Sequence, residues 1–137
     1  MKPEQILIQH DLRKTQGRIM VLQEFSKHDK ALAHNELQHA LAGKVDRVTL
    51  YRILDQFEKK GVLHKIPDDE VSVKYALCAH NHEIDHQHSD DHAHFKCNDC
   101  SETFCIDDFT IPNMKIPEGF KVTEKFLLLG GVCKKCA

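Results

Sequence analysis

The sequence predicts an α+β protein: an N-terminal winged helix-turn-helix followed by a small C-terminal α/β domain with a four-cysteine zinc site. Three features indicate this fold class. The first 66 residues have the apolar periodicity of short helices and end in the first of two short strand-like segments, and two Cys-x-x-Cys pairs lie near the C-terminus. We place the winged-helix domain at residues 1–78, a histidine-rich loop at 79–94 and the C-terminal domain at 95–137.

The helical part begins with an amphipathic segment. Arg13, Lys14 and Arg18 lie outside its apolar face, which is formed by Leu12, Ile19, Leu22 and Phe25. A second short helix is expected over residues 34–41, ending near Gly43.

A third helix is expected to begin after Asp46, a favourable N-cap, and to run to Lys60 with Gly61 as its C-cap. Its buried stripe is predicted to be Leu50, Ile53, Leu54 and Phe57. The residues predicted to point away from that stripe are Val48, Arg52, Asp55, Gln56 and Lys59.

Two short strands, 62–66 and 71–77, are expected on either side of a turn at 67–70. Three helices followed by such a hairpin are typical of a winged helix-turn-helix. A helical bundle with a surface hairpin is the alternative.

The histidine-rich segment contains three His-x-His pairs among polar residues, so we expect most of it to be a mobile loop. Beyond it, residues 104–106 and 120–129 have the character of strands. Pro112 and Pro117 disfavour a helix of more than a turn or two between them.

Charge is distributed unevenly along the chain. Residues 1–66 carry 12 Lys/Arg and 8 Asp/Glu, a net charge of +4, whereas residues 67–137 carry 7 and 13, a net charge of −6. This asymmetry suggests that the N-terminal domain faces an anion. Residues 1–14 lack an apolar signal core, and the longest apolar run, 126–132, is too short to span a bilayer. We therefore expect a cytoplasmic protein without a membrane partner.

Six cysteines in a reducing compartment point to metal rather than to disulfides. The strongest signal is the pair of knuckles formed by Cys97, Cys100, Cys133 and Cys136, because four thiolates saturate a tetrahedral zinc ion. Such a closed site would be structural. Two disulfides or four free thiols are the alternative.

Five further donors remain outside the knuckles. They are the soft ligands Cys78 and Cys105 and the imidazoles of His64, His92 and His94. On the residues alone, Cys105 between two apolar neighbours could equally be a small buried hydrophobe.

Four motifs, in order along nearly the whole chain, resemble the ferric uptake regulator (Fur) superfamily. The segment Thr49-Leu-Tyr51-Arg52-Ile-Leu is similar to its recognition helix, and residues 12–18 are similar to its Thr-x-x-Arg opening. Residues 92–100 match its His-x-His-x-x-Cys-x-x-Cys signature, and residues 131–136 match its C-terminal end.

The resemblance implies a homodimer, formed through the C-terminal domain, that binds inverted-repeat operators in double-stranded DNA. Thr49, Tyr51 and Arg52 are then expected in the major groove, with Arg52 on guanine and Tyr51 on a thymine methyl. Arg13, Lys14 and Arg18 are expected at phosphates or the minor groove. A solvated surface charge is the alternative for Arg52.

Within the superfamily, residues 63–65 and 75–78 are most similar to the zinc uptake regulators. This likeness implies a regulatory zinc bound by His64, Cys78, Cys105 and His92 or His94, in addition to the structural zinc, about two ions per chain. Cys105 stands where those regulators carry an acid, and Ala31 and Ala76 stand where the iron and peroxide sensors carry ligands. The implied function is zinc-dependent repression of zinc uptake genes.

Three alternatives remain. A family member could sense iron, another metal or peroxide, and a protein of another class could use its histidine-rich loop to buffer metal. A small zinc hydrolase would need an open zinc and a general base, and no His-Glu-x-x-His pattern occurs, so we expect no enzymatic activity.

Overall fold

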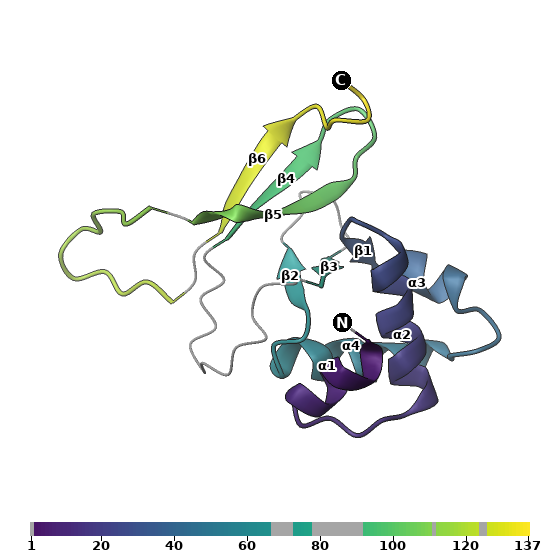
Figure 1. Ribbon diagram of the computed structural model, residues 1–137. Helices are drawn as coiled ribbons and strands as arrows, with labels where there is room; N and C mark the ends of the chain where they lie inside the picture. The colour runs from purple at the N-terminus through teal and green to yellow at the C-terminus, as the bar shows by residue number, and fades with distance from the viewer. Residues whose placement is uncertain (1, 67–72, 78–91, 111, 124–125) are drawn as a thin grey trace. The chain divides into compact units, whose positions relative to one another are not determined.

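The computed structural model describes residues 2–66, 73–77, 92–110, 112–123 and 126–137. The chain divides into two compact units, Met1–Ile84 and Asp85–Ala137 (Figure 1). Helices are found in the first unit, whereas the regular elements described in the second unit are all strands. The helical part expected in the C-terminal domain is therefore not found among its described residues.

Four helices make up most of the first unit: α1 (Pro3–Gln9), α2 (Gln16–Lys27), α3 (His34–Ala40) and α4 (Arg47–Lys59). They enclose one apolar core, in which Leu7, Leu22, Leu50 and Phe57 are completely buried. The expected positions of α3 and α4 are confirmed to within a residue, and so is the buried stripe of α4.

The start of the chain differs from the prediction. Helix α2 begins at Gln16, because the hydroxyl of Thr15 accepts a hydrogen bond from the backbone N–H of Arg18 at 3.3 Å and caps it. Leu12 lies before this cap, so placing it on the same helix as Ile19 was wrong. The separate helix α1 was not expected either.

Helix α4 begins where expected and ends one residue early, at Lys59, so that Lys60 and not Gly61 is its C-cap. The carboxylate of Asp46 accepts from the backbone N–H of Thr49 at 3.3 Å and also from the Thr49 hydroxyl. These bonds, the one from the hydroxyl first, lower the pKa of Asp46. At the other end Gly61 has φ 75°, a left-handed conformation that glycine adopts without a steric cost.

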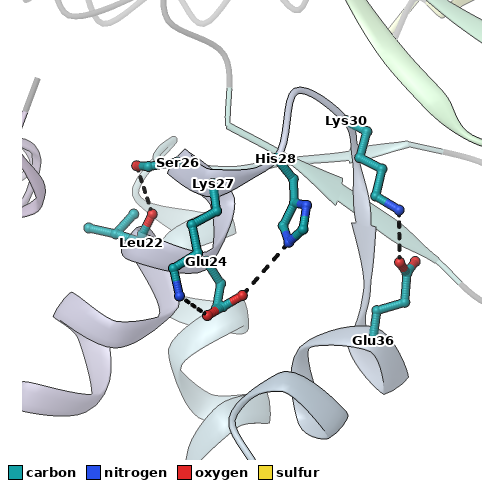
Figure 2. A network of polar contacts seen from close by, with 7 residues as sticks. All are labelled: Leu22, Glu24, Ser26, Lys27, His28, Lys30 and Glu36. Carbon is teal, nitrogen blue, oxygen red and sulfur yellow. Dashed lines mark hydrogen bonds and ion pairs between the residues drawn. The ribbon is translucent and has the colours of Figure 1, made fainter. Parts of the chain in front are cut away.

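Polar contacts lie at the end of α2 and between the following connection and α3 (Figure 2). The buried carboxylate of Glu24 lies 2.8 Å from Nζ of Lys27 and 3.9 Å from Nε2 of His28. Across the connection Lys30 pairs with Glu36 at 3.4 Å. Partly exposed pairs of this kind contribute about 0–1 kcal/mol each, so they orient the turn more than they stabilise it.

The wing is a three-stranded sheet with the order β1 (Leu32–Ala33), β3 (Lys74–Ala76), β2 (His64–Ile66), all antiparallel. The hairpin of β2 and β3 confirms the prediction, although both strands are shorter than expected and residues 67–72 lie outside the described part. Strand β1 was not predicted, since two residues carry no periodicity.

The second unit contains a sheet with the order β5 (Thr103–Thr110), β4 (His92–Cys97), β6 (Leu127–Gly131). Strand β5 pairs antiparallel with β4, and β6 pairs parallel with it (Figure 1). The strand predicted over 120–129 was placed too early, because residues 120–123 are not in a strand and β6 begins at Leu127. Residues 92–94, assigned to the histidine-rich loop, lie in β4.

No helix among the described residues is long and apolar enough to cross a membrane. The longest is α4 with 13 residues, whereas a bilayer-spanning helix needs about 20.

Candidate functional site

The two cysteine knuckles meet because the strands that precede them are parallel neighbours. In the β4–β6 register Cys97 is opposite Gly131, so both strands end at the same edge of the sheet. The backbone N–H of Asn98 donates to the carbonyl of Gly131 at 2.7 Å and holds the two chain segments together there. The knuckle turns that follow place all four cysteines in one cluster.

The cluster fits a zinc ion. The sulfur atoms of Cys97, Cys100, Cys133 and Cys136 all lie within 4.8 Å of one another, and those of Cys100 and Cys133 are 3.9 Å apart. A tetrahedral zinc with Zn–S bonds of about 2.3 Å requires sulfurs about 3.8 Å apart. Cys97 and Cys133 are buried, whereas Cys100 and Cys136 are exposed.

The acidity of the thiols also favours a cation. The backbone N–H groups of Cys100 and Cys133 lie 3.5 and 3.4 Å from Sγ of Cys97 and lower its pKa to about 6. The neighbouring thiol of Cys133, followed by burial, raises the pKa of Cys136 to about 12. Cys97 therefore loses its proton readily, whereas Cys136 does not. A divalent cation would favour deprotonation of Cys136 by compensating the negative charges of the thiolates.

A second pair of donors lies in the same sheet. His94 of β4 and Cys105 of β5 are directly opposite each other in the antiparallel register. Residues opposed in this way have Cβ atoms about 4.5–5.5 Å apart on one face of the sheet. His94 is buried and Cys105 is half-buried. The pair offers one imidazole and one thiol.

The other predicted regulatory ligands are described only in part. His64 is half-buried in β2 of the first unit, opposite Ala76. Cys78 lies outside the described residues, and for His92 the backbone in β4 is described but the side chain is not. The structure therefore brings His94 and Cys105 together and leaves the rest of that ligand set a prediction.

Helix α4 presents a polar face on the side opposite the core. Tyr51 and Arg52 are exposed, as are Val48, Asp55, Gln56 and Lys59, in agreement with the predicted face. Thr49 is exposed too, but its hydroxyl donates to Asp46 and caps the helix. This face could enter the major groove of DNA, which admits one α-helix.

The basic residues before and within α2 divide into two kinds. Arg13 and Lys14 are exposed. The guanidinium of Arg18 instead donates to the carbonyl of Arg13 at 2.6 Å and to Oε1 of Gln56 at 2.5 Å. Arg18 thus joins the loop before α2 to α4, a contact that the sequence did not indicate.

The sequence also did not single out His34, the first residue of α3. Its ring stacks on that of Tyr51, with centroids 3.6 Å apart and an angle of 15° between the planes. Seventeen positions separate the two residues, so no helical or strand periodicity could have linked them.

Comparison with known proteins places this arrangement in one family. The sequence profile described as "Ferric uptake regulator family" matches residues 9–128. A relative from Bordetella parapertussis, named "Ferric uptake regulation protein", is 26% identical over 133 residues, covering 91% of this chain and 89% of its own length.

Solved structures share the fold. A zinc uptake regulator in complex with zinc and DNA superposes with a TM-score of 0.67 at 23% identity, covering 97% of this chain and 89% of its own. A crystal structure of holo XcZur superposes with a TM-score of 0.69 at 22% identity, covering 97% and 92%.

Proposed function

The chain belongs to the ferric uptake regulator family, and on that premise we propose that it is a zinc-responsive repressor that binds inverted-repeat DNA as a homodimer. It is thus a regulator rather than an enzyme. The observation that carries the choice of zinc is the pairing of His94 with Cys105 in the β4–β5 register. An imidazole and a thiolate favour zinc over Fe²⁺ or Mn²⁺, which prefer harder oxygen ligands.

Two buried alanines support the same choice. Ala31 and Ala76 are 1% and 3% exposed and offer no donor atom, at positions where the resemblance implies ligands in the iron and peroxide sensors. The competing proposal is an iron sensor, which the name of the Bordetella relative favours. The two proposals differ in the metal that restores DNA binding.

For DNA, the support is the exposed face of α4. Arg52 would form bidentate bonds with guanine O6 and N7, and Tyr51 would contact a thymine methyl. Arg13 and Lys14 would neutralise phosphates, and Arg18 would hold their loop against α4. The solved relative bound to zinc and DNA is consistent with this assignment.

For the homodimer, the support is a set of exposed apolar residues in the second unit. They are 41–73% exposed, and two of them lie in β6, the edge strand of the described sheet; they are Phe120, Phe126, Leu128, Leu129 and Val132. Large exposed apolar residues gathered in one small unit mark an interface, and a second copy of the chain is the occupant that we propose.

We propose two zinc sites with different roles. Cys97, Cys100, Cys133 and Cys136 would hold a structural ion, and His64, Cys78, Cys105 with His92 or His94 would hold a regulatory ion. When bound, the regulatory zinc would supply a cross-link among these ligands. A coupling of about 1–3 kcal/mol, or roughly 5–150-fold in DNA affinity, is usual for such switches.

The test is a selection of DNA from a random-sequence library by the full chain, with Zn²⁺, Fe²⁺ or Mn²⁺ buffered at graded free concentrations. We expect an inverted repeat to be enriched at low free Zn²⁺ and not with Fe²⁺ at comparable occupancy. Enrichment by Fe²⁺ alone would support the iron sensor. Metal binding without any enriched sequence would support a buffering protein.

A further inference from the structure

The ring of Tyr51 is packed by one residue from another helix and by one from its own. His34, at the start of α3, stacks on it nearly parallel at a centroid distance of 3.6 Å. Arg47, one turn before Tyr51 on α4, places its guanidinium carbon 5.8 Å from the centre of the same ring. Tyr51 is nevertheless 47% exposed. The residue is therefore held by neighbours and still available to a ligand.

The position of His34 is not explained by hydrogen bonding at Nε2. This atom is buried, and no hydrogen-bond partner for it exists within the described part of the chain. A buried unpaired polar atom is unfavourable. The contact that the structure shows for the ring is the stack on Tyr51.

His34 is also suited to stacking by its charge. Burial first, and the positive charge of Arg47 second, lower the pKa of His34. Both causes disfavour the protonated ring, so the neutral form, which does not repel the Arg47 guanidinium, is favoured.

We propose that His34 is a positioning residue that holds the Tyr51 ring in the orientation that reads a thymine methyl in DNA. The inference rests on the proposed DNA-binding function. A tyrosine on an open helix face has more than one favourable χ1 rotamer, and ordering it on binding reduces affinity. The stack removes that freedom before DNA arrives, so the contact gains affinity and selectivity for thymine.

The experiment uses the full zinc-loaded chain and the duplex that the unsubstituted chain enriches from the random library. Affinities are measured for His34→Ala, Tyr51→Ala and the double variant. His39→Ala is the matched control, because His39 lies on the same helix and is exposed. Thermal melting of each variant reports any general loss of structure.

We expect His34→Ala to weaken binding about 2- to 10-fold, the range of an aromatic stacking contact. The double variant should bind as Tyr51→Ala does, because His34 acts only through Tyr51. His34→Phe keeps a flat ring and should restore most of the affinity, and His39→Ala should bind normally.

Discrimination between thymine and deoxyuridine is a second measurement. It would not change if His34 had a purely structural role. Each thymine of the duplex is replaced in turn by deoxyuridine, which lacks only the methyl group. The unsubstituted chain should lose affinity at one position in each half-site, and His34→Ala should lose less at that position.

Three outcomes would overturn the proposal: additive losses in the double variant, unchanged thymine discrimination in His34→Ala, or a His34→Phe variant as weak as His34→Ala. Failure of the unsubstituted chain to enrich any duplex would instead refute the DNA-binding function on which the proposal rests.

Discussion

His94 and Cys105 are cross-strand partners, one buried in β4 and the other half-buried in β5. The register alone sets an imidazole beside a thiol on one face of the sheet. Cys105 lies where the resemblance to zinc uptake regulators implies an acid. The role of Cys105 can therefore be tested by comparing two substitutions, Cys105→Ser and Cys105→Glu.

If Cys105 is a regulatory ligand, Cys105→Ser should raise the free zinc needed for DNA binding, because a hydroxyl stays protonated and binds zinc weakly. Cys105→Glu should recover much of the response. Zinc titrations of operator binding, followed by fluorescence anisotropy, measure both effects.

The same two variants should behave differently if Cys105 does not bind zinc. If Cys105 is only a packing residue, Cys105→Ser should cost little, and Cys105→Glu should lower the melting temperature by burying a charge. A Glu variant that melts early and does not regain its zinc response would exclude the ligand role.

The two metal sites should differ in their response to chelators. A closed four-thiolate site has no open position for attack, and loss of its ion is coupled to unfolding. We expect mild EDTA to remove one metal per chain, while the second leaves only as the fold is lost. Metal analysis and circular dichroism on the same samples check this. Joint loss of both ions from a chain that stays folded would contradict it.

Arg52→Ala should abolish specific DNA binding without affecting the fold or the metals. The expected loss is about 1–3 kcal/mol per half-site, the worth of a bidentate guanine contact. Lys27→Ala is the control, since Lys27 is also a cation of the first unit, 65% exposed and paired with Glu24 at 2.8 Å, but lies on α2. Equal, small losses for both variants would show that Arg52 is an ordinary surface charge.

Gly131 should tolerate a side chain less well than its neighbour Gly130. A Cβ at Gly131 would lie 3.1 Å from Cζ of Phe95, whereas a Cβ at Gly130 would meet its nearest atom at 3.9 Å. Replacing glycine by alanine lowers the conformational entropy of the unfolded chain by a similar amount at both sites, so the difference in stability isolates the clash. We expect Gly131→Ala to be about 1–3 kcal/mol less stable than Gly130→Ala. Denaturant unfolding of both zinc-loaded variants measures this, and equal stabilities would contradict the close packing.

Acidification should destabilise the first unit through His34. Its pKa is lowered in the folded chain by burial and by Arg47, so protonation favours the unfolded state. The contribution of neutral His34 to the free energy of unfolding is complete above its pKa in the unfolded chain, about 6.5. It is lost as the pH falls towards the pKa of His34 in the folded chain. The melting temperature should fall more between about pH 7.5 and 5.5 in the unsubstituted chain than in His34→Phe. An equal decrease in melting temperature for the two proteins would show that the folded chain does not lower the pKa of His34.

Elements specified by local interactions were predictable from the sequence. Asp46 caps α4 from three residues away, and Leu50, Ile53, Leu54 and Phe57 repeat with the helical period, so the bounds of this helix, to within a residue, and its buried face are as expected. The spacing within each cysteine knuckle likewise identified the four cysteines that the structure brings together.

Local sequence patterns gave wrong predictions where two patterns disagreed about the same segment. They also missed elements that were too short to show a period. The apolar face that included Leu12 suggested a longer helix, but the cap at Thr15 decides where α2 begins. Strand β1 has two residues and exists only because β3 pairs with it. In the second unit, the alternation of Phe120 and Val122 predicted a strand that has no partner among the described residues.

By itself the sequence determined the composition of the site: four knuckle cysteines, soft donors outside them and a helix with an exposed Tyr51 and Arg52. Only the tertiary structure decided which of these residues meet. The parallel register of β4 and β6 joins the two knuckles, the antiparallel register of β4 and β5 sets His94 beside Cys105, and packing of α3 against α4 stacks His34 on Tyr51. The reason is physical: periodicity and capping act over about four residues along the chain, whereas these contacts join residues 11 to 39 positions apart.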